Sequence, residues 1–215
     1  MGAIARAAAN NITTSGVFTS GAITNSSVTG ITVLANASDG ITLISSQTAS
    51  NSASISFTSG LTSTYKAYKF VFSNVHPRTD SVWLEFNFST DGGSNYNVTK
   101  TSTHFYAYHS EDDSGTALNY YAAQDLAQST SFQRITGTHS SDADHGVSGT
   151  LQLFNPSSTT YVKHWITNVN SIDEANISFN NYTAGYGNTT SAINAIQFKM
   201  SSGNFDGTIY LYGIK

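Results

Sequence analysis

The chain has 215 residues, of which only 10% are charged and none is cysteine. The net charge is −4 and the nine Lys and Arg residues are scattered singly, so no basic surface is available for nucleic acid. The absence of cysteine excludes disulfides, thiolate metal sites and thiol nucleophiles, and the length suits one domain with an appendage.

Membrane insertion is not expected from the hydropathy pattern. No apolar run approaches the roughly 20 residues that span a bilayer as a helix. The first residues also lack the continuous apolar stretch of a signal peptide. A protein of this composition without an export signal could leave its cell by lysis, on a virus particle.

Residues 1–60 are too poor in large apolar side chains to build a core of their own. From Ala7 to Gly60 the only charged residue is Asp39 and the only aromatic residues are Phe18 and Phe57. One interpretation is a disordered linker. The other, which we favour, is an oligomeric shaft of intertwined β-branched strands. We therefore predict an arm over residues 1–60 for attachment and oligomerisation, beginning with a short helix at residues 3–11.

From about residue 57 the chain alternates apolar and polar residues with the period of half-buried strands. The clearest faces are Tyr68, Phe70 and Phe72, and Val82, Leu84, Phe86 and Phe88. Turn residues separate these two runs, which predicts that they are antiparallel neighbours. Further strands are predicted at residues 149–154, 161–167, 175–179, 195–200 and 207–212.

The strand spacing predicts an all-β fold. We expect a C-terminal antiparallel β-sandwich or jelly roll over residues 61–215, preceded by the extended Ser/Thr/Gly-rich β shaft or arm. Residues 117–128 are the only candidate helix in this half of the chain.

Two motifs together resemble those of β-sandwich domains in tailed-bacteriophage virion proteins. The first is Phe88-Ser-Thr-Asp-Gly-Gly-Ser-Asn-Tyr96, and the second is the closing Gly203-Asn-Phe-Asp-Gly-Thr-Ile-Tyr-Leu-Tyr-Gly-Ile-Lys215. The resemblance covers roughly residues 60–215. It implies a symmetric virion part, of the tail-fibre, head-fibre or capsid-decoration type, with the sandwich displayed outward. It carries no catalytic residue over to this chain.

Two acidic segments are candidate metal loops, His139 to His145 and His109 to Gly115. Asp and His side chains ligate calcium or transition metals, but both segments are equally well explained as solvated turns. We expect no metal and no cofactor. The chain also lacks a Gly-x-Ser-x-Gly elbow and a His-Glu-x-x-His helix, which predicts a protein that is not an enzyme.

Aromatic clusters offer candidate ligand sites. Sugar rings stack on aromatic side chains, and Tyr in surface loops indicates binding more often than packing. The candidate residues are Tyr106, Tyr108, Tyr120, Tyr121, Tyr182 and Tyr186.

The function that we expect is that of a trimeric, fibre-like or spike-like structural protein at the virion surface. Residues 1–60 would attach it to other virion proteins, and the sandwich would bind a host glycan. The first alternative is a capsid decoration protein whose arm binds the capsid. Two others are a carbohydrate-binding module and a glycosidase, which would need two acids about 5 to 9 Å apart.

Overall fold

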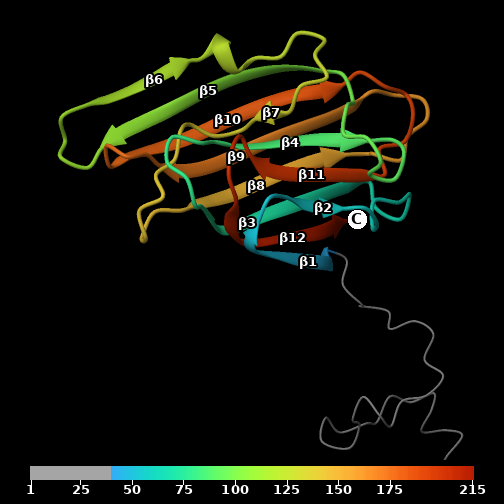
Figure 1. The fold of residues 1–215 in the computed structure, drawn as a ribbon. Coiled ribbons are helices and arrows are strands. Elements are labelled where there is room, and N and C mark those ends of the chain that lie inside the picture. Colours follow the sequence, from blue (N-terminus) through green and yellow to red (C-terminus); the bar gives the residue numbers. More distant parts are fainter. Residues whose placement is uncertain (1–39) are drawn as a thin grey trace, which may run out of the picture. The chain divides into compact units, whose positions relative to one another are not determined.

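The computed structural model describes residues 40–215. Most of the predicted arm, including the predicted helix at residues 3–11, lies outside the described residues. The described part contains no α-helix and forms two antiparallel β-sheets that face each other, as Figure 1 shows. The predicted β-sandwich is therefore confirmed. No helix of the described part has the length and the apolar character that are needed to cross a membrane.

The larger sheet has eight strands and the smaller sheet has four. The larger sheet runs, edge to edge, β1 (Ile41–Ser52), β12 (Phe205–Ile214), β3 (Ala67–Pro77), β8 (Val147–Phe154), β9 (Lys163–Ile172), β10 (Ile177–Gly187), β5 (Lys100–Ser110) and β6 (Thr116–Tyr120). The smaller sheet runs β2 (Ile55–Phe57), β11 (Ala195–Met200), β4 (Leu84–Ser89) and β7 (Gln133–Arg134). Within residues 40–215, one 3-10 turn, η2 (Ala122–Gln124), follows β6.

The core lies between the two sheets and is rich in aromatic rings. Ring centroids are 5.4 Å apart between Phe57 and Phe70 and 5.0 Å apart between Phe86 and Trp165. Both pairs join one sheet to the other, in edge-to-face geometry that stabilises beyond simple burial. The two apolar faces predicted from the alternation are buried here, and this part of the prediction is confirmed.

The turn after β4 is closed by Asp91 and two glycines. The Ser89 hydroxyl donates to the Asp91 carboxylate (2.6 Å) and accepts from the Gly93 amide (3.0 Å). The bond from the Ser89 hydroxyl, together with bonds from the side chain and amide of Asn95, holds the pKa of Asp91 down to about 2. Gly92 and Gly93 have φ angles of 74° and 91°, which glycine adopts without a steric penalty.

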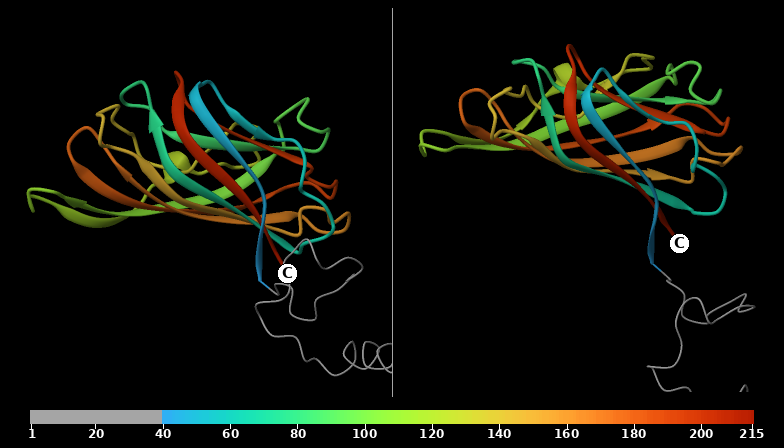
Figure 2. Two further views of the ribbon diagram at one scale, coloured as in Figure 1. Left: turned by 90° about the horizontal axis from the view of Figure 1, so that it is seen from below. Right: turned by 60° about the horizontal axis from the view of Figure 1, so that its bottom comes forward.

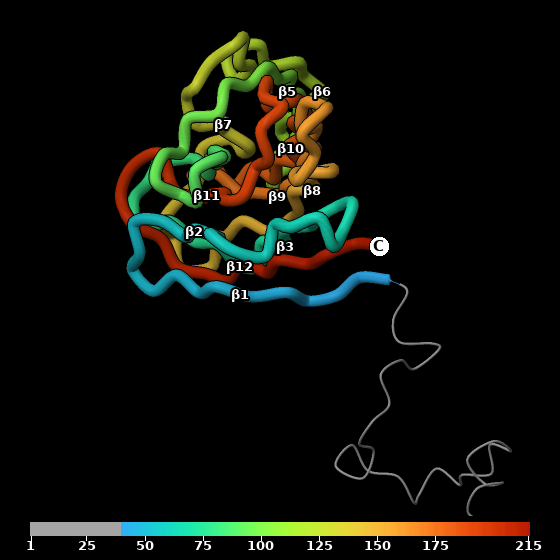
Figure 3. The backbone as a smooth tube through the Cα atoms, turned by 90° about the vertical axis from the view of Figure 1, so that its right-hand side faces the viewer, coloured from blue at the N-terminus to red at the C-terminus, as the bar shows by residue number. Residues whose placement is uncertain are grey.

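The larger sheet bends around the smaller one, from β1 at one end to β5 and β6 at the other, as Figure 3 shows. On β10 and β5 the inner face is covered by the segment between β6 and β8, whose Ile135 and His139 are buried. The opposite face of the larger sheet, here called the outer face, carries no other element of the described part (Figure 2).

Four expectations differ from the structure. Strands β1 and β2 pair with β12 and β11, so the compact unit begins at Gly40 and not at residue 61. The runs around Phe70 and Phe86 are not neighbours, because they belong to different sheets and face each other. Residues 117–128 form β6 and η2, since pairing with β5 outweighs the helix propensity of the alanines. Strand β5 was not predicted at all.

Candidate binding face

We predicted that the six candidate tyrosines lie in surface loops, and for five of them this is wrong. Five belong to β5, β6 or β10, and Tyr121 follows β6 directly. Since successive side chains of a strand point to opposite faces, the sheet divides the six into two groups. Tyr106, Tyr108 and Tyr121 lie on the inner face, and Tyr120, Tyr182 and Tyr186 lie on the outer face.

The inner group is part of the packing. The Tyr106 ring lies 5.4 Å from Phe179 and 5.9 Å from Tyr121, both edge-to-face. The neighbouring His104 is fully buried, with its Nδ1 2.7 Å from the Thr183 hydroxyl. Burial lowers the pKa of His104 to about 4, so the imidazole is neutral at pH 7. Contacts with Phe179 give Tyr106 and Tyr108 a structural role between β5 and β10, whereas the Tyr121 side chain stays 40% exposed.

The outer group is built around a stacked aromatic pair. The rings of Phe105 and Tyr182 lie side by side on β5 and β10, with centroids 5.0 Å apart and planes only 9° from parallel. The Phe105 side chain is 41% exposed. Asn180 Nδ2 donates to the Tyr182 hydroxyl at 2.9 Å and fixes that ring. The pair presents a rigid aromatic surface to solvent.

Strand register extends this pair into two rows across the sheet. The first row is Thr150, Asn168, Tyr182, Phe105 and Tyr120. The second row is Lys69, Gln152, Ile166, Ala184 and Thr103. Directly opposite residues of neighbouring strands share one face, so all ten side chains point outward.

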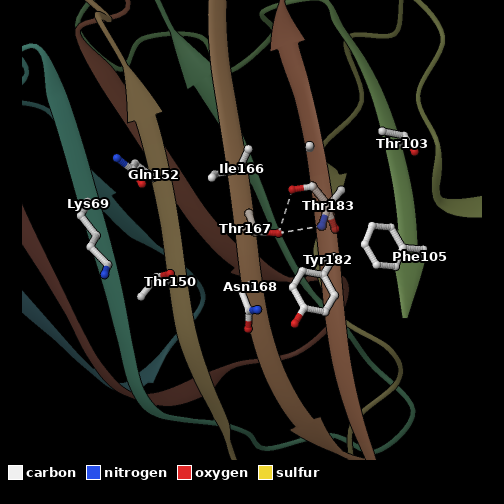
Figure 4. A pocket seen from close by; sticks show the side chains of 11 residues that line it. Lys69, Thr103, Phe105, Thr150, Gln152, Ile166, Thr167, Asn168, Tyr182 and Thr183 are labelled. Carbon is white, nitrogen blue, oxygen red and sulfur yellow. Dashed lines mark hydrogen bonds between the residues drawn. The ribbon is translucent and has the colours of Figure 1, made fainter. Parts of the chain in front are cut away.

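A hollow of about 380 Å³ lies over these two rows on β3, β8, β9, β10 and β5. Figure 4 shows Phe105 and Tyr182 at one end and Lys69 at the other. The hollow exists because the small Ala184 and Thr103 stand beside the large Phe105, Tyr182 and Ile166. Its size is that of a small-ligand site.

The hollow combines an apolar surface with neutral hydrogen-bonding groups. Apolar surface comes from Phe105, Tyr182 and the 48% exposed Ile166, and hydrogen-bonding groups come from Gln152 and Asn168. No Asp or Glu lines it, so it lacks the carboxylate pair that a glycosidase needs.

The other two outer tyrosines lie at its margins. Tyr186 is one row farther along β10, where its ring is 6.2 Å from His164, and it lines an adjacent hollow of about 430 Å³. The Tyr120 hydroxyl donates to the Asp125 carboxylate, which fixes this ring at the β6 edge.

Sequence analysis missed Phe105, Ile166, Asn168, Gln152 and Lys69. Ile166 directly follows the buried Trp165 on β9, and the local sequence does not show that it faces solvent on the same side as Phe105. Only the pairing register shows which residues of five strands share a row.

Neither candidate metal loop gathers a ligand set. His139 is buried, and its Nε2 is 2.7 Å from the Thr136 hydroxyl. His109 Nε2 lies 3.0 Å from Asp113 at the exposed end of β5. Within residues 40–215, no three His, Asp or Glu side chains are arranged to hold a metal ion.

Comparison with known proteins gives no relative: no family model, no curated protein and no solved structure matches this chain.

Proposed function

We propose that this protein is a non-enzymatic structural protein of a bacteriophage virion, fibre-like or spike-like and trimeric, that displays residues 40–215 at the particle surface. In this proposal the outer face of the larger sheet binds a glycan of the host surface. The resemblance of the two sequence motifs to phage virion proteins supports the virion part. The low charge and the β-sandwich fit it as well.

The stacked pair of Phe105 and Tyr182 is the observation that carries the glycan part. An exposed, preorganised aromatic surface matches the apolar face of a sugar ring. The amide groups of Asn168 and Gln152, in the same hollow, suit its hydroxyls. A site fixed on strands loses little freedom when a ligand binds, because its side chains are already ordered by packing.

Binding of oligosaccharides to the full chain, measured by calorimetry after a glycan-array screen, tests the glycan part. Phe105→Ala is expected to weaken binding about tenfold or more, because burying a phenyl ring contributes about 1.5–3 kcal/mol. The matched control is Tyr161→Ala, which removes an exposed aromatic ring outside the hollow. Equal affinity in the two variants would exclude the hollow as the glycan site.

Detection of the chain in purified phage particles by mass spectrometry tests the virion part. It also separates a virion protein from a free carbohydrate-binding module, which would bind sugars in the same way. Absence of the chain from the particles would leave the module as the better proposal.

A capsid decoration protein is the second candidate, and the two edges of the larger sheet favour it. Ile41 and Leu43 on β1 and Leu118 on β6 are more than half exposed. All three point to the outer face by register with Ile214, Tyr212 and Ala107. Such apolar surface suits contact with another protein. Binding to isolated capsids, together with no binding to any saccharide, would make this the better proposal.

A further inference from the structure

Lys69 is the only charged residue on the outer face of the five strands that form the hollow. The outer positions of β8, β9, β10 and β5 carry Ser, Thr, Asn, Gln, His, Tyr, Phe, Ile and Ala. On β3 they carry Ala67, Lys69, Val71, Ser73 and, beyond the bulge, His76. Among the ion pairs between described residues, none involves Lys69.

The place of Lys69 in the hollow is defined by register. It stands opposite Gln152 on β8 and opposite Tyr212 on β12. Three strand spacings separate β3 from β10, which is about 14 Å at roughly 4.8 Å each. A ligand that touches both Lys69 and Tyr182 must therefore be longer than one sugar ring.

Lys69 gives the hollow two chemically different ends. The ammonium group favours a negative charge, and the stacked rings favour an apolar surface. The side chains between them, Gln152 and Asn168, favour neutral hydroxyl groups. No carboxylate of the protein neutralises the ammonium or repels an anion within the hollow.

We infer that the hollow binds an acidic oligosaccharide, with a sugar carboxylate against Lys69 and a sugar ring stacked on Phe105 and Tyr182. This inference rests on the proposed glycan binding. It adds the charge of the ligand and its direction across the strands, from the carboxylate at β3 to the stacked ring at β10 and β5.

Matched pairs of saccharides on the full chain test the inference. The probes are tetragalacturonate and its methyl ester, and sialyl-lactose and lactose, each measured by calorimetry at low and at physiological salt. At least one acidic probe is expected to bind about fivefold more tightly than its neutral partner at low salt. The preference should shrink as salt screens the charges.

Three variants assign the effect to its residues. Lys69→Met should remove the preference for the acidic probe, whereas Phe105→Ala should weaken both members of the pair. Lys66→Met removes the same charge from an exposed position three residues away and should change nothing.

Two failures are distinguishable. Binding that depends on Phe105 but shows no preference for the acidic probe, or a preference that survives Lys69→Met, would overturn the inference and leave the proposed function intact. Failure of every saccharide in the screen and of all four probes to bind would overturn the proposed glycan binding together with the inference.

Discussion

At the scale of single residues, Lys100 is fully buried, and none of the ion pairs between described residues involves it. Its Nζ donates to the Asn87 side-chain oxygen at 2.5 Å and to the Val98 carbonyl at 2.9 Å. Burial lowers the pKa of Lys100 to about 7. Removing an ammonium group from water is costly even when it is hydrogen-bonded, so the fold favours the neutral amine.

This burial predicts stability that rises with pH. Between pH 7 and the unfolded pKa of 10.5, the unfolded chain holds a proton that the folded chain has released. The free energy of unfolding should therefore increase by up to about 1.4 kcal/mol per pH unit. Lys100→Met should flatten this rise in urea unfolding curves from pH 7 to 10. Lys66→Met is the exposed control. If the free energy of unfolding of Lys100→Met rises with pH as steeply as that of the wild-type protein, Lys100 is not the cause of the rise.

Two buried histidines predict that the protein also loses stability at acid pH. Burial lowers the pKa of His104 to about 4 and that of His139 to about 3. Stability is complete above the unfolded pKa of 6.5. It is lost as the pH falls toward 4, because the unfolded chain takes up protons that the folded chain cannot. His104→Gln should make the free energy of unfolding less dependent on pH between 6.5 and 4. The exposed His109→Gln should behave like the wild-type protein, and an unchanged acid slope in His104→Gln would count against this explanation.

At the scale of elements, the sequence predicts a strand well where apolar residues mark its buried face. The predicted strand at residues 195–200 has the observed bounds of β11, because Ile196, Phe198 and Met200 make the alternation plain. Strand β5 was not predicted because its buried face is not apolar: the buried positions include Lys100, His104 and Ser110. Lys100 is hydrogen-bonded to Asn87 and His104 to Thr183, and the local sequence of β5 does not reveal these distant partners.

The edge strand β6 has no charged residue to discourage pairing with another chain. Leu118 is 71% exposed on it, and edge strands commonly carry Lys or Pro for protection. We expect concentration-dependent association through this edge. Leu118→Lys should reduce the association seen by sedimentation velocity while the melting temperature stays within about 2 °C, since surface changes are usually within 0.5 kcal/mol. Association that persists unchanged would show that β6 is not the contact.

At the scale of the whole molecule, composition predicts the sandwich but not its N-terminal boundary. Residues 41–57 contain no charged and only one aromatic residue, so their composition resembles that of the preceding segment. Their place in the sheets is determined by partners far along the chain, such as Ile196 opposite Phe57 and Tyr212 opposite Leu43. A pattern within residues 1–60 cannot show those contacts.

Two truncations separate folding from oligomerisation. Removal of residues 1–39 should leave the melting temperature of the sandwich unchanged, because residues 40–215 form a compact unit of their own. Removal of residues 1–60 should lower it steeply. That deletion strips β1 from β12 and removes the buried Ile55 and Phe57, each worth about 1.5–3 kcal/mol.

Light scattering on the same proteins tests the proposed trimer. If residues 1–39 hold three copies together, the full chain should have three times the mass of the chain, and the protein that begins at Gly40 should be a folded monomer. Comparing the mass of the full chain with that of the protein that begins at Gly40 separates oligomerisation from folding. Removal of residues 1–39 is expected to abolish the trimer without removing a strand of the sandwich. A trimer that survives this deletion would place the contact on the sandwich, and the exposed residues of β1 and β6 would be the first to change.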